Sequence, residues 1–133
     1  MSLFRFVQWI REGRPVLVFG DGRQERDFTY VDDVARGTIA SLRPFGYEIF
    51  NLGSDEPVVL ADAVRLVEEY TGMEARIVNE PRHKADVLAT WANIDKAGRM
   101  LDWRPRTSFA QGVRNLVDWY EENRAWASAI RTG

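Results

Sequence analysis

The stretch Arg26-Asp27-Phe28-Thr29-Tyr30-Val31-Asp32-Asp33-Val34-Ala35 says more about the fold of this chain than any other segment. It follows a glycine turn at residues 20–22 and precedes three further landmarks in a fixed order. These landmarks are Asn51-Leu52-Gly53, Ala92-Asn93-Ile94-Asp95-Lys96-Ala97 and Leu101-Asp102-Trp103-Arg104-Pro105. A single short motif is weak evidence, but an ordered series with fixed spacing is specific.

The composition is that of one soluble globular domain. The chain has 133 residues, of which 45% are hydrophobic and 29% are charged, and this length is enough to bury a core. The net charge is −2, and the basic residues form no stripe of the kind that binds nucleic acid. No apolar run approaches the roughly 20 residues that cross a bilayer. We therefore expect a single domain over residues 1–133, with no nucleic-acid or membrane partner.

The chain contains no cysteine and one histidine, His83. This excludes disulfides, thiolate catalysis and cysteine-metal sites, and a lone histidine makes a poor metal site. The residues after Met1 lack the long apolar stretch of a signal peptide. We expect a cytoplasmic protein without a bound metal.

The first part of the chain alternates helix, strand and turn signals. Apolar residues spaced three or four apart over residues 3–10 predict a helix that ends near Gly13. An extended run at residues 16–19 leads into the turn at residues 20–22, where glycine adopts angles that other residues resist. Residues 28–31 predict a short strand.

The second signal group lies between Asp32 and Leu52. Asp32 or Asp33 can cap a helix, and its inward positions are then Ala35, Ile39 and Leu42. The short apolar run Tyr47–Leu52 is bounded by glycines and predicts a buried strand.

Five elements are predicted in the rest of the chain: a helix at residues 60–71 that stops at Gly72, a strand at 76–78, an extended stretch at 90–92, a helix from Asn93 to Leu101, and a helix that begins at Ser108. Ser108 and Gln111 have the spacing of a capping box. The last helix places Phe109, Val113, Leu116 and Tyr120 on one face. Helices with several short strands indicate an α+β fold or a piece of an α/β fold.

The landmark series resembles the carboxy-terminal part of NAD-dependent nucleotide-sugar epimerases and dehydratases, the extended short-chain dehydrogenase family. The resemblance covers residues 3–126 and is strongest to members that act on UDP-glucose or UDP-glucuronate. It implies a substrate-binding portion without the amino-terminal Rossmann half, and it implies NAD as the cofactor of a full-length member.

The resemblance also implies a set of substrate-binding residues. Main-chain groups of Leu17 and Phe19 correspond to positions that contact uracil. Arg26 corresponds to an arginine on the diphosphate, where its charged fork suits phosphate oxygens, and Phe28 corresponds to an aromatic residue beside the nucleotide. From the residues alone, a surface ion pair between Arg26 and a neighbouring carboxylate is the alternative interpretation; the candidates are Asp21, Glu25 and Asp27.

A second implied site element is the segment around His83. The family pattern Arg-x-Gly-Asp places an arginine on the diphosphate and an aspartate near the ribose. Here Asp86 matches the aspartate, but His83 takes the arginine position and Ala85 takes that of the glycine. Arg82 and Lys84 flank His83, so which cation contacts phosphate stays open. The alternative is a solvated loop.

Two other patterns are given structural roles. Asp32 and Asp33 are adjacent, and adjacent carboxylates rarely converge on one ligand, so helix capping is favoured over acid–base chemistry or metal binding. Asn51-Leu52-Gly53 is interpreted as a strand end with a tight exit at Gly53.

The sequence shows no catalytic or cofactor-binding residues. It has no glycine-rich turn between a strand and a helix near its start, which a dinucleotide needs. None of its four tyrosines begins a Tyr-x-x-x-Lys motif, which in the resembling family supplies the acid/base. We therefore expect a nucleotide-sugar-binding portion that is inactive alone, either as an excised or truncated piece or as one half of a split isomerase.

The alternative function is a non-catalytic module that binds a nucleotide sugar or a partner protein. In either case we expect apolar surface to be left bare where the other half of the family would lie. This predicts a homo-oligomer or a partner that supplies the missing half. The sugar, and the choice between epimerase and dehydratase, stay open.

Overall fold

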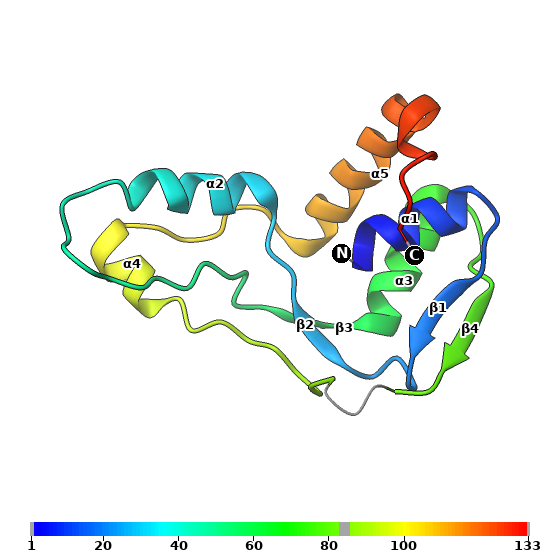
Figure 1. Ribbon diagram of the computed structural model, residues 1–133, viewed down its shortest axis with the longest axis horizontal. Helices are drawn as coiled ribbons and strands as arrows, with labels where there is room; N and C mark the ends of the chain where they lie inside the picture. Colours follow the sequence, from blue (N-terminus) through cyan, green and yellow to red (C-terminus); the bar gives the residue numbers. More distant parts are fainter. Residues whose placement is uncertain (1, 83–85, 133) are drawn as a thin grey trace.

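The computed structural model describes residues 2–82 and 86–132 of the chain, and its elements divide between two ends of an elongated molecule (Figure 1). One end contains the helices α1 (Ser2–Arg11), α3 (Leu60–Thr71) and α5 (Phe109–Ala127) and the strands β1 (Val16–Phe19) and β4 (Ile77–Glu80). The other end contains α2 (Val31–Ala40) and α4 (Asp95–Leu101), and β2 (Glu25–Asp27) and β3 (Pro57–Val59) lie between the two ends. The mixed helices and strands confirm the predicted fold class.

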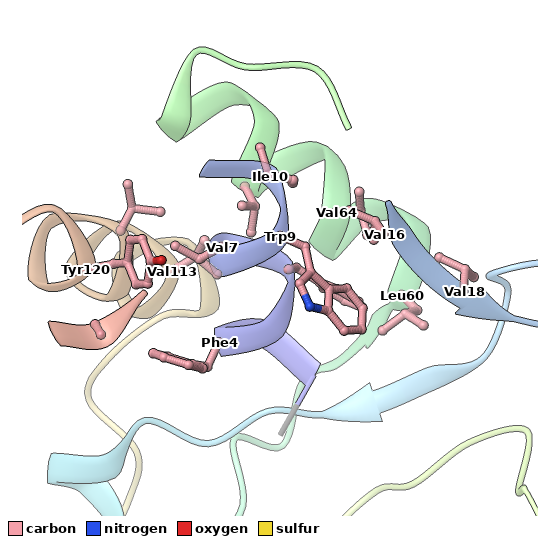
Figure 2. Close-up of a cluster of buried hydrophobic side chains, with 14 residues drawn as sticks. Phe4, Val7, Trp9, Ile10, Val16, Val18, Leu60, Val64, Val113 and Tyr120 are labelled. Atoms are coloured by element: carbon pink, nitrogen blue, oxygen red, sulfur yellow. The ribbon is translucent and has the colours of Figure 1, made fainter. Parts of the chain in front are cut away.

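The main core lies where α1, α3 and α5 meet β1 (Figure 2). Apolar residues at helical spacing turn one face of each helix inward, and alternate residues of β1 join them. The cluster includes Phe4, Val7, Trp9, Ile10, Val16, Val18, Leu60, Val64, Val67, Val113, Val117 and Tyr120. The three helices and the strand that the sequence predicts here are confirmed, with their apolar faces in the core.

The ends of these helices follow local sequence signals. Helices α1 and α3 are followed by Gly13 and Gly72, whose φ angles are 65° and 66°, a left-handed conformation that favours glycine. The Oγ of Ser108 accepts a hydrogen bond from the Gln111 main-chain N–H at 3.2 Å, so Ser108 caps α5. The Gln111 side chain donates to Asn115 instead of returning to the cap. The predicted capping box is therefore only half formed.

The strands form two small sheets, one at the end that contains the main core and one between the two ends of the molecule. Strands β1 and β4 are parallel, with Val16 opposite Ile77, and β4 matches the strand predicted at residues 76–78. Strands β2 and β3 are antiparallel, with Arg26 opposite Val58. The strand predicted at residues 28–31 is wrong, because β2 ends at Asp27 and Val31 already begins α2. Aromatic and β-branched residues favour a strand there, but the pairing partners lie opposite residues 25–27.

A second apolar cluster joins α2 to α4. Its buried members are Ile94, Ala97, Leu101 and Trp103, and Phe45, Phe50 and Leu52 pack against them. Helix α4 starts at Asp95, whose N–H donates to the Asn93 side chain at 3.0 Å. A Cβ at Gly37 would lie 2.6 Å from Leu52 and 2.9 Å from the indole nitrogen of Trp103, so only glycine allows α2 to approach this closely.

The predicted orientation of α2 is wrong. Ala35, Ile39 and Leu42 are exposed, whereas Asp33 and Gly37 face inward. The residue before the helix is Tyr30, which makes no side-chain cap, so neither aspartate has the predicted capping role. The inward face is set by hydrogen bonds to Asp33 and by the small size of Gly37, and these outweigh apolar periodicity.

The strand predicted at Tyr47–Leu52 is also wrong. These residues pair with no strand in the described part of the chain. Phe50 and Leu52 pack on the second cluster, whereas Tyr47 is 89% exposed and Ile49 is 65% exposed. No helix within residues 2–82 and 86–132 has both the length and the hydropathy to span a bilayer.

Candidate nucleotide-binding site

The free edge of β1 presents the main-chain groups of Leu17 and Phe19. The N–H groups of Val16 and Gly20 donate to Arg76 and Glu80 across the β1–β4 pair. Because these directions alternate along a strand, the polar groups of Leu17 and Phe19 point to the opposite edge. The Phe19 carbonyl already accepts a hydrogen bond from the Gln24 side chain at 2.8 Å. The described residues thus leave Leu17 as the freer of the two predicted main-chain positions.

The glycine turn after β1 is anchored on both sides. Gly20 and Gly22 have φ angles of 83° and 77°, which glycine adopts without strain. The Gly20 carbonyl accepts from the Asn79 side chain at 2.8 Å, and Asp21 Oδ1 accepts from the Arg23 main-chain N–H at 3.1 Å. The turn therefore holds a fixed shape beside the end of β4.

Arg26 and Asp86 form a direct ion pair. Arg26 Nη2 lies 2.6 Å from Asp86 Oδ1, and the two side chains are 21% and 29% exposed. Arg26 Nη1 also donates to the Glu25 carbonyl at 2.7 Å. The structure thus brings together two residues of the predicted site. An ion pair of Arg26 is also what the alternative interpretation expects, but its partner is Asp86 and not Asp21, Glu25 or Asp27.

Arg82 also contacts Asp86, and we call Arg26 and Arg82 together the basic corner. The Nη2 of Arg82 donates to the Asp86 carbonyl. Its aliphatic carbons lie 3.5–3.8 Å from where a Cβ of Gly20 would be. The guanidinium groups of Arg26 and Arg82 therefore both contact Asp86, and the aliphatic part of Arg82 packs beside the glycine turn. The predicted site residue His83 lies outside the described residues, as do Lys84 and Ala85.

Phe28 lies beside an apolar cavity of about 340 Å³. Its ring is 5.3 Å from that of Phe109, and the cavity is also lined by Leu3, Tyr30, Ser108 and Leu116. A groove of about 670 Å³ shares Phe4, Tyr30, Val31 and Leu116 with this cavity and extends toward Trp119 and Arg131. Phe28 and Leu17 both pack against the main core, so the same cluster of side chains supports both residues.

Asp27 is a residue of this region whose role the sequence analysis did not identify. Its carboxylate accepts hydrogen bonds from the Ser54 N–H at 2.7 Å, the Ser54 hydroxyl at 2.5 Å and the Ala92 N–H at 3.0 Å. Burial of the carboxyl opposes ionisation, but these hydrogen bonds outweigh it and lower the pKa of Asp27 below its ordinary value. The available signal was its position between two predicted site residues, Arg26 and Phe28.

The Asp33 carboxylate connects α2 to the segment before α5. Oδ2 accepts hydrogen bonds from the main-chain N–H groups of Arg106 and Thr107 at 3.0 and 2.9 Å, and Oδ1 pairs with Arg36. Burial opposes ionisation, yet the Arg36 and backbone hydrogen bonds lower the pKa of Asp33. Asp32 is exposed, so the two do not converge. The described residues contain no cluster of three or more metal-binding side chains.

Gly53 does not end a strand as predicted, because the residues before it form no strand in the described part of the chain. Its φ angle is not in the left-handed region. A Cβ at Gly53 would instead lie 2.4 Å from Ala92 Cβ and 2.6 Å from Asp27 Oδ2. The glycine is required by close approach between chain segments.

Comparison with known proteins adds a family relationship to this geometry. Residues 1–53 match the NAD-dependent epimerase/dehydratase family. A UDP-glucuronate 4-epimerase of Thermodesulfobacterium geofontis is 49% identical over 98% of this chain and 41% of its own length. The chain spans about two fifths of the length of the curated relatives it matches.

Solved structures show the same fold. A UDP-glucose 4-epimerase of Thermotoga maritima with UDP-glucose superposes with a TM-score of 0.88 and 29% identity, over 93% of this chain and 40% of that one. A UDP-glucuronic acid 4-epimerase of Bacillus cereus with UDP-glucuronic acid and NAD gives a TM-score of 0.86 and 32% identity, over 92% of this chain and 40% of that one. These neighbours share the architecture of extended short-chain dehydrogenases.

Proposed function

Since this chain belongs to the NAD-dependent epimerase/dehydratase family, we propose that it forms the nucleotide-sugar-binding part of a UDP-sugar epimerase. The observation that supports this most directly is the ion pair of Arg26 and Asp86. Two residues that the family resemblance assigns to one ligand are in contact, although they are 60 positions apart in the sequence.

The proposed uracil position is the free edge of β1. A flat base edge needs a main-chain donor and a main-chain acceptor, and the groups of Leu17 and Phe19 point away from β4. Because Gln24 occupies the Phe19 carbonyl, the base would either displace that side chain or rely on the Phe19 N–H and on Leu17. Phe28 would provide an apolar wall beside the nucleotide.

The proposed diphosphate position is the basic corner of Arg26 and Arg82. A guanidinium group presents paired N–H donors that match two phosphate oxygens. Arg26 is held by a carboxylate that phosphate oxygens can replace, because the pair is partly exposed and such pairs are worth about 1 kcal/mol or less. Asp86 would then be free to accept a hydrogen bond from a ribose hydroxyl.

The described residues do not fit the NAD that the family uses. A dinucleotide pyrophosphate needs a glycine-rich turn that leads from a strand directly into a helix. Here the turn at residues 20–22 leads into β2, and the next helix starts at Val31. We therefore assign no hydride step to these residues. We expect no saturable NAD binding by this chain at micromolar affinity and no epimerisation of UDP-galactose or UDP-galacturonate by it.

The partner proposal rests on an exposed apolar face. This face consists of Val34, Ile39 and Leu42 with Tyr47 and Ile49, all of them exposed. Exposed apolar surface that is extensive tends to be buried by association. We propose that it is covered in a homo-oligomer, or by a nucleotide-binding half where one is present. The same face supports the second candidate function, a protein-interaction module without catalysis.

The test of the binding function is an NMR titration of the chain with UDP, and with uridine as the matched ligand without phosphates. We expect UDP to shift resonances in residues 17–28 and at Asp86, and to bind more tightly than uridine. If UDP shifts no resonance in these segments, the chain alone has no nucleotide site, and the interaction-module function is the better account.

A further inference from the structure

Two short segments, residues 53–54 and 90–92, converge on Asp27. Its two carboxylate oxygens receive three hydrogen bonds, from the Ser54 N–H, the Ser54 hydroxyl and the Ala92 N–H. Its own N–H donates to the Thr90 hydroxyl at 3.3 Å. Gly53 approaches so closely that it has no room for a Cβ. One side chain thus connects β2 to residues 53–54 and to residues 90–92.

The pattern of these bonds shows what the carboxylate replaces. The Glu25 N–H donates to the Leu88 carbonyl at 2.8 Å, and the Thr90 N–H donates to the Glu25 carbonyl at 3.2 Å, as in a parallel ladder. The next two ladder bonds would join the Asp27 N–H to the Thr90 carbonyl and the Ala92 N–H to the Asp27 carbonyl. Both are instead made with side-chain oxygens, those of Thr90 and Asp27.

Because side-chain oxygens take the place of main-chain carbonyls, the two segments can lie farther apart at Asp27 and still be joined by hydrogen bonds. Residues 88–92 therefore stay aligned with β2. Among the described residues, main-chain pairing between the two segments is limited to the bridge of Glu25 with Ala89. Asp86 lies two residues before Leu88, and Arg26 lies next to Glu25, so this alignment sets one against the other. Arg26 Nη1 also reaches toward the Leu88 carbonyl at 3.5 Å.

We infer that Asp27 is the positioning residue of the proposed nucleotide site: its carboxylate holds residues 90–92 along β2 and thereby holds Arg26 and Asp86 together. The inference rests on the proposed function, because it concerns the same site. Asp27 acts through Arg26 and makes no contact with the ligand.

An amide cannot replace this carboxylate. Three donors point at its two oxygens, whereas asparagine offers one oxygen and one NH₂ group. Asp27→Asn therefore sets an N–H group against a donor at either Ser54 or Ala92, with little change in size. The matched control is Asp32→Asn, which changes an exposed carboxylate on the first turn of α2.

The test is a double-mutant cycle on UDP affinity with Asp27→Asn and Arg26→Ala. We expect Asp27→Asn to weaken UDP binding roughly tenfold in the native background, the effect of losing one well-placed charge-assisted bond. Its effect should be much smaller when Arg26 is already alanine, and it should weaken the binding of uridine, which keeps the ribose but lacks the phosphates, much less than that of UDP. Equal weakening in both backgrounds would mean a general structural role and would overturn the inference.

A second measurement separates this inference from the function on which it rests. If the native chain binds no UDP, the proposed function fails, and the positioning claim is tested by NMR without ligand. Asp27→Asn should then speed amide exchange at Ala92 and shift the Arg26 side-chain N–H signal, whereas Asp32→Asn should do neither. An unchanged Arg26 signal would overturn it. If Asp27→Asn does not fold, Thr90→Val removes one side-chain bond and should give a smaller change of the same kind.

Discussion

The indole N–H of Trp103 donates a hydrogen bond to the main-chain carbonyl of Asp33 at 2.8 Å, and both residues are buried. This contact joins the segment after α4 to the first turn of α2, 70 positions apart in the sequence. Around it, the Asp33 carboxylate accepts N–H groups of residues 106 and 107, just before α5. The end of the molecule that contains α2 and α4 is thus stabilised by these hydrogen bonds as well as by the second apolar cluster.

The close approach at Gly37 predicts a steric cost. Gly37→Ala would place a Cβ 2.6 Å from Leu52 and 2.9 Å from the Trp103 indole nitrogen. We expect a loss of about 1–3 kcal/mol in the free energy of unfolding, as for other overpacked sites. Urea denaturation measures it. Thr38→Ala, at the next and exposed position, is the control and should change stability by less than about 0.5 kcal/mol. Equal midpoints for both variants would contradict the packing.

The lowered pKa of Asp33 predicts a loss of stability in acid. A carboxyl whose folded pKa lies below its unfolded value contributes stability above the unfolded pKa, and this is lost as the pH falls through the folded value. The ordinary value for Asp33 is 3.8, so the loss should begin as the pH approaches 4 and continue below it. Asp33→Asn should be less stable at pH 7 and should lose less on acidification. A parallel pH profile for the two proteins in urea denaturation would be the contrary result.

The hydrogen bonds of Gln8 connect α1 to the last described residues of the chain, and their loss should reduce stability. This fully buried side chain donates to the carbonyls of Ala127, Ser128 and Ile130 and accepts from the Thr132 hydroxyl at 2.6 Å. Gln8→Leu leaves these groups without their partner, and we expect a loss of about 1–3 kcal/mol. Amide exchange of residues 128–132 should quicken as well. The exposed Gln111→Ala serves as control, and a stable Gln8→Leu with unchanged exchange would show that these hydrogen bonds are not needed.

The exposed face of α2 predicts association. Light scattering over a wide concentration range should show a homodimer or higher oligomer, and the pair Ile39→Glu with Leu42→Glu should shift it to monomer. Ile77→Thr, at an exposed residue of β4 at the other end of the molecule, should leave the association unchanged. A native chain that stays monomeric at high concentration would exclude self-association as the way in which this face is covered.

Elements governed by local signals could be predicted from the sequence. Helices α1, α3 and α5 have apolar residues at helical spacing, and glycine or serine marks their ends, so no distant contact is needed to place them. The orientation of α2 could not be predicted in this way. Its inward face is chosen by N–H groups of residues 106 and 107 and by the space available at Gly37, which are properties of distant segments.

The candidate site divides in the same way. The residues alone left Arg26 as one of many surface cations, and the family resemblance singled out Arg26 and Asp86 together. Their contact depends on how residues 86–92 align with β2, and no local pattern encodes this. Asp27 was missed for the same reason, because its three donors come from segments 27 and 65 positions away.

The most direct test of the central claim is the affinity of the chain for UDP with Arg26 intact and with Arg26→Ala. A charge-assisted hydrogen bond of roughly 1.5–3 kcal/mol predicts a ten- to hundredfold loss of UDP affinity. The affinity for uridine should not change. Arg23→Ala, which removes an exposed arginine beside Asp21, should leave the UDP affinity within about twofold. If Arg26→Ala and Arg23→Ala bind UDP equally well, Arg26 does not contact the diphosphate and the proposed site is wrong.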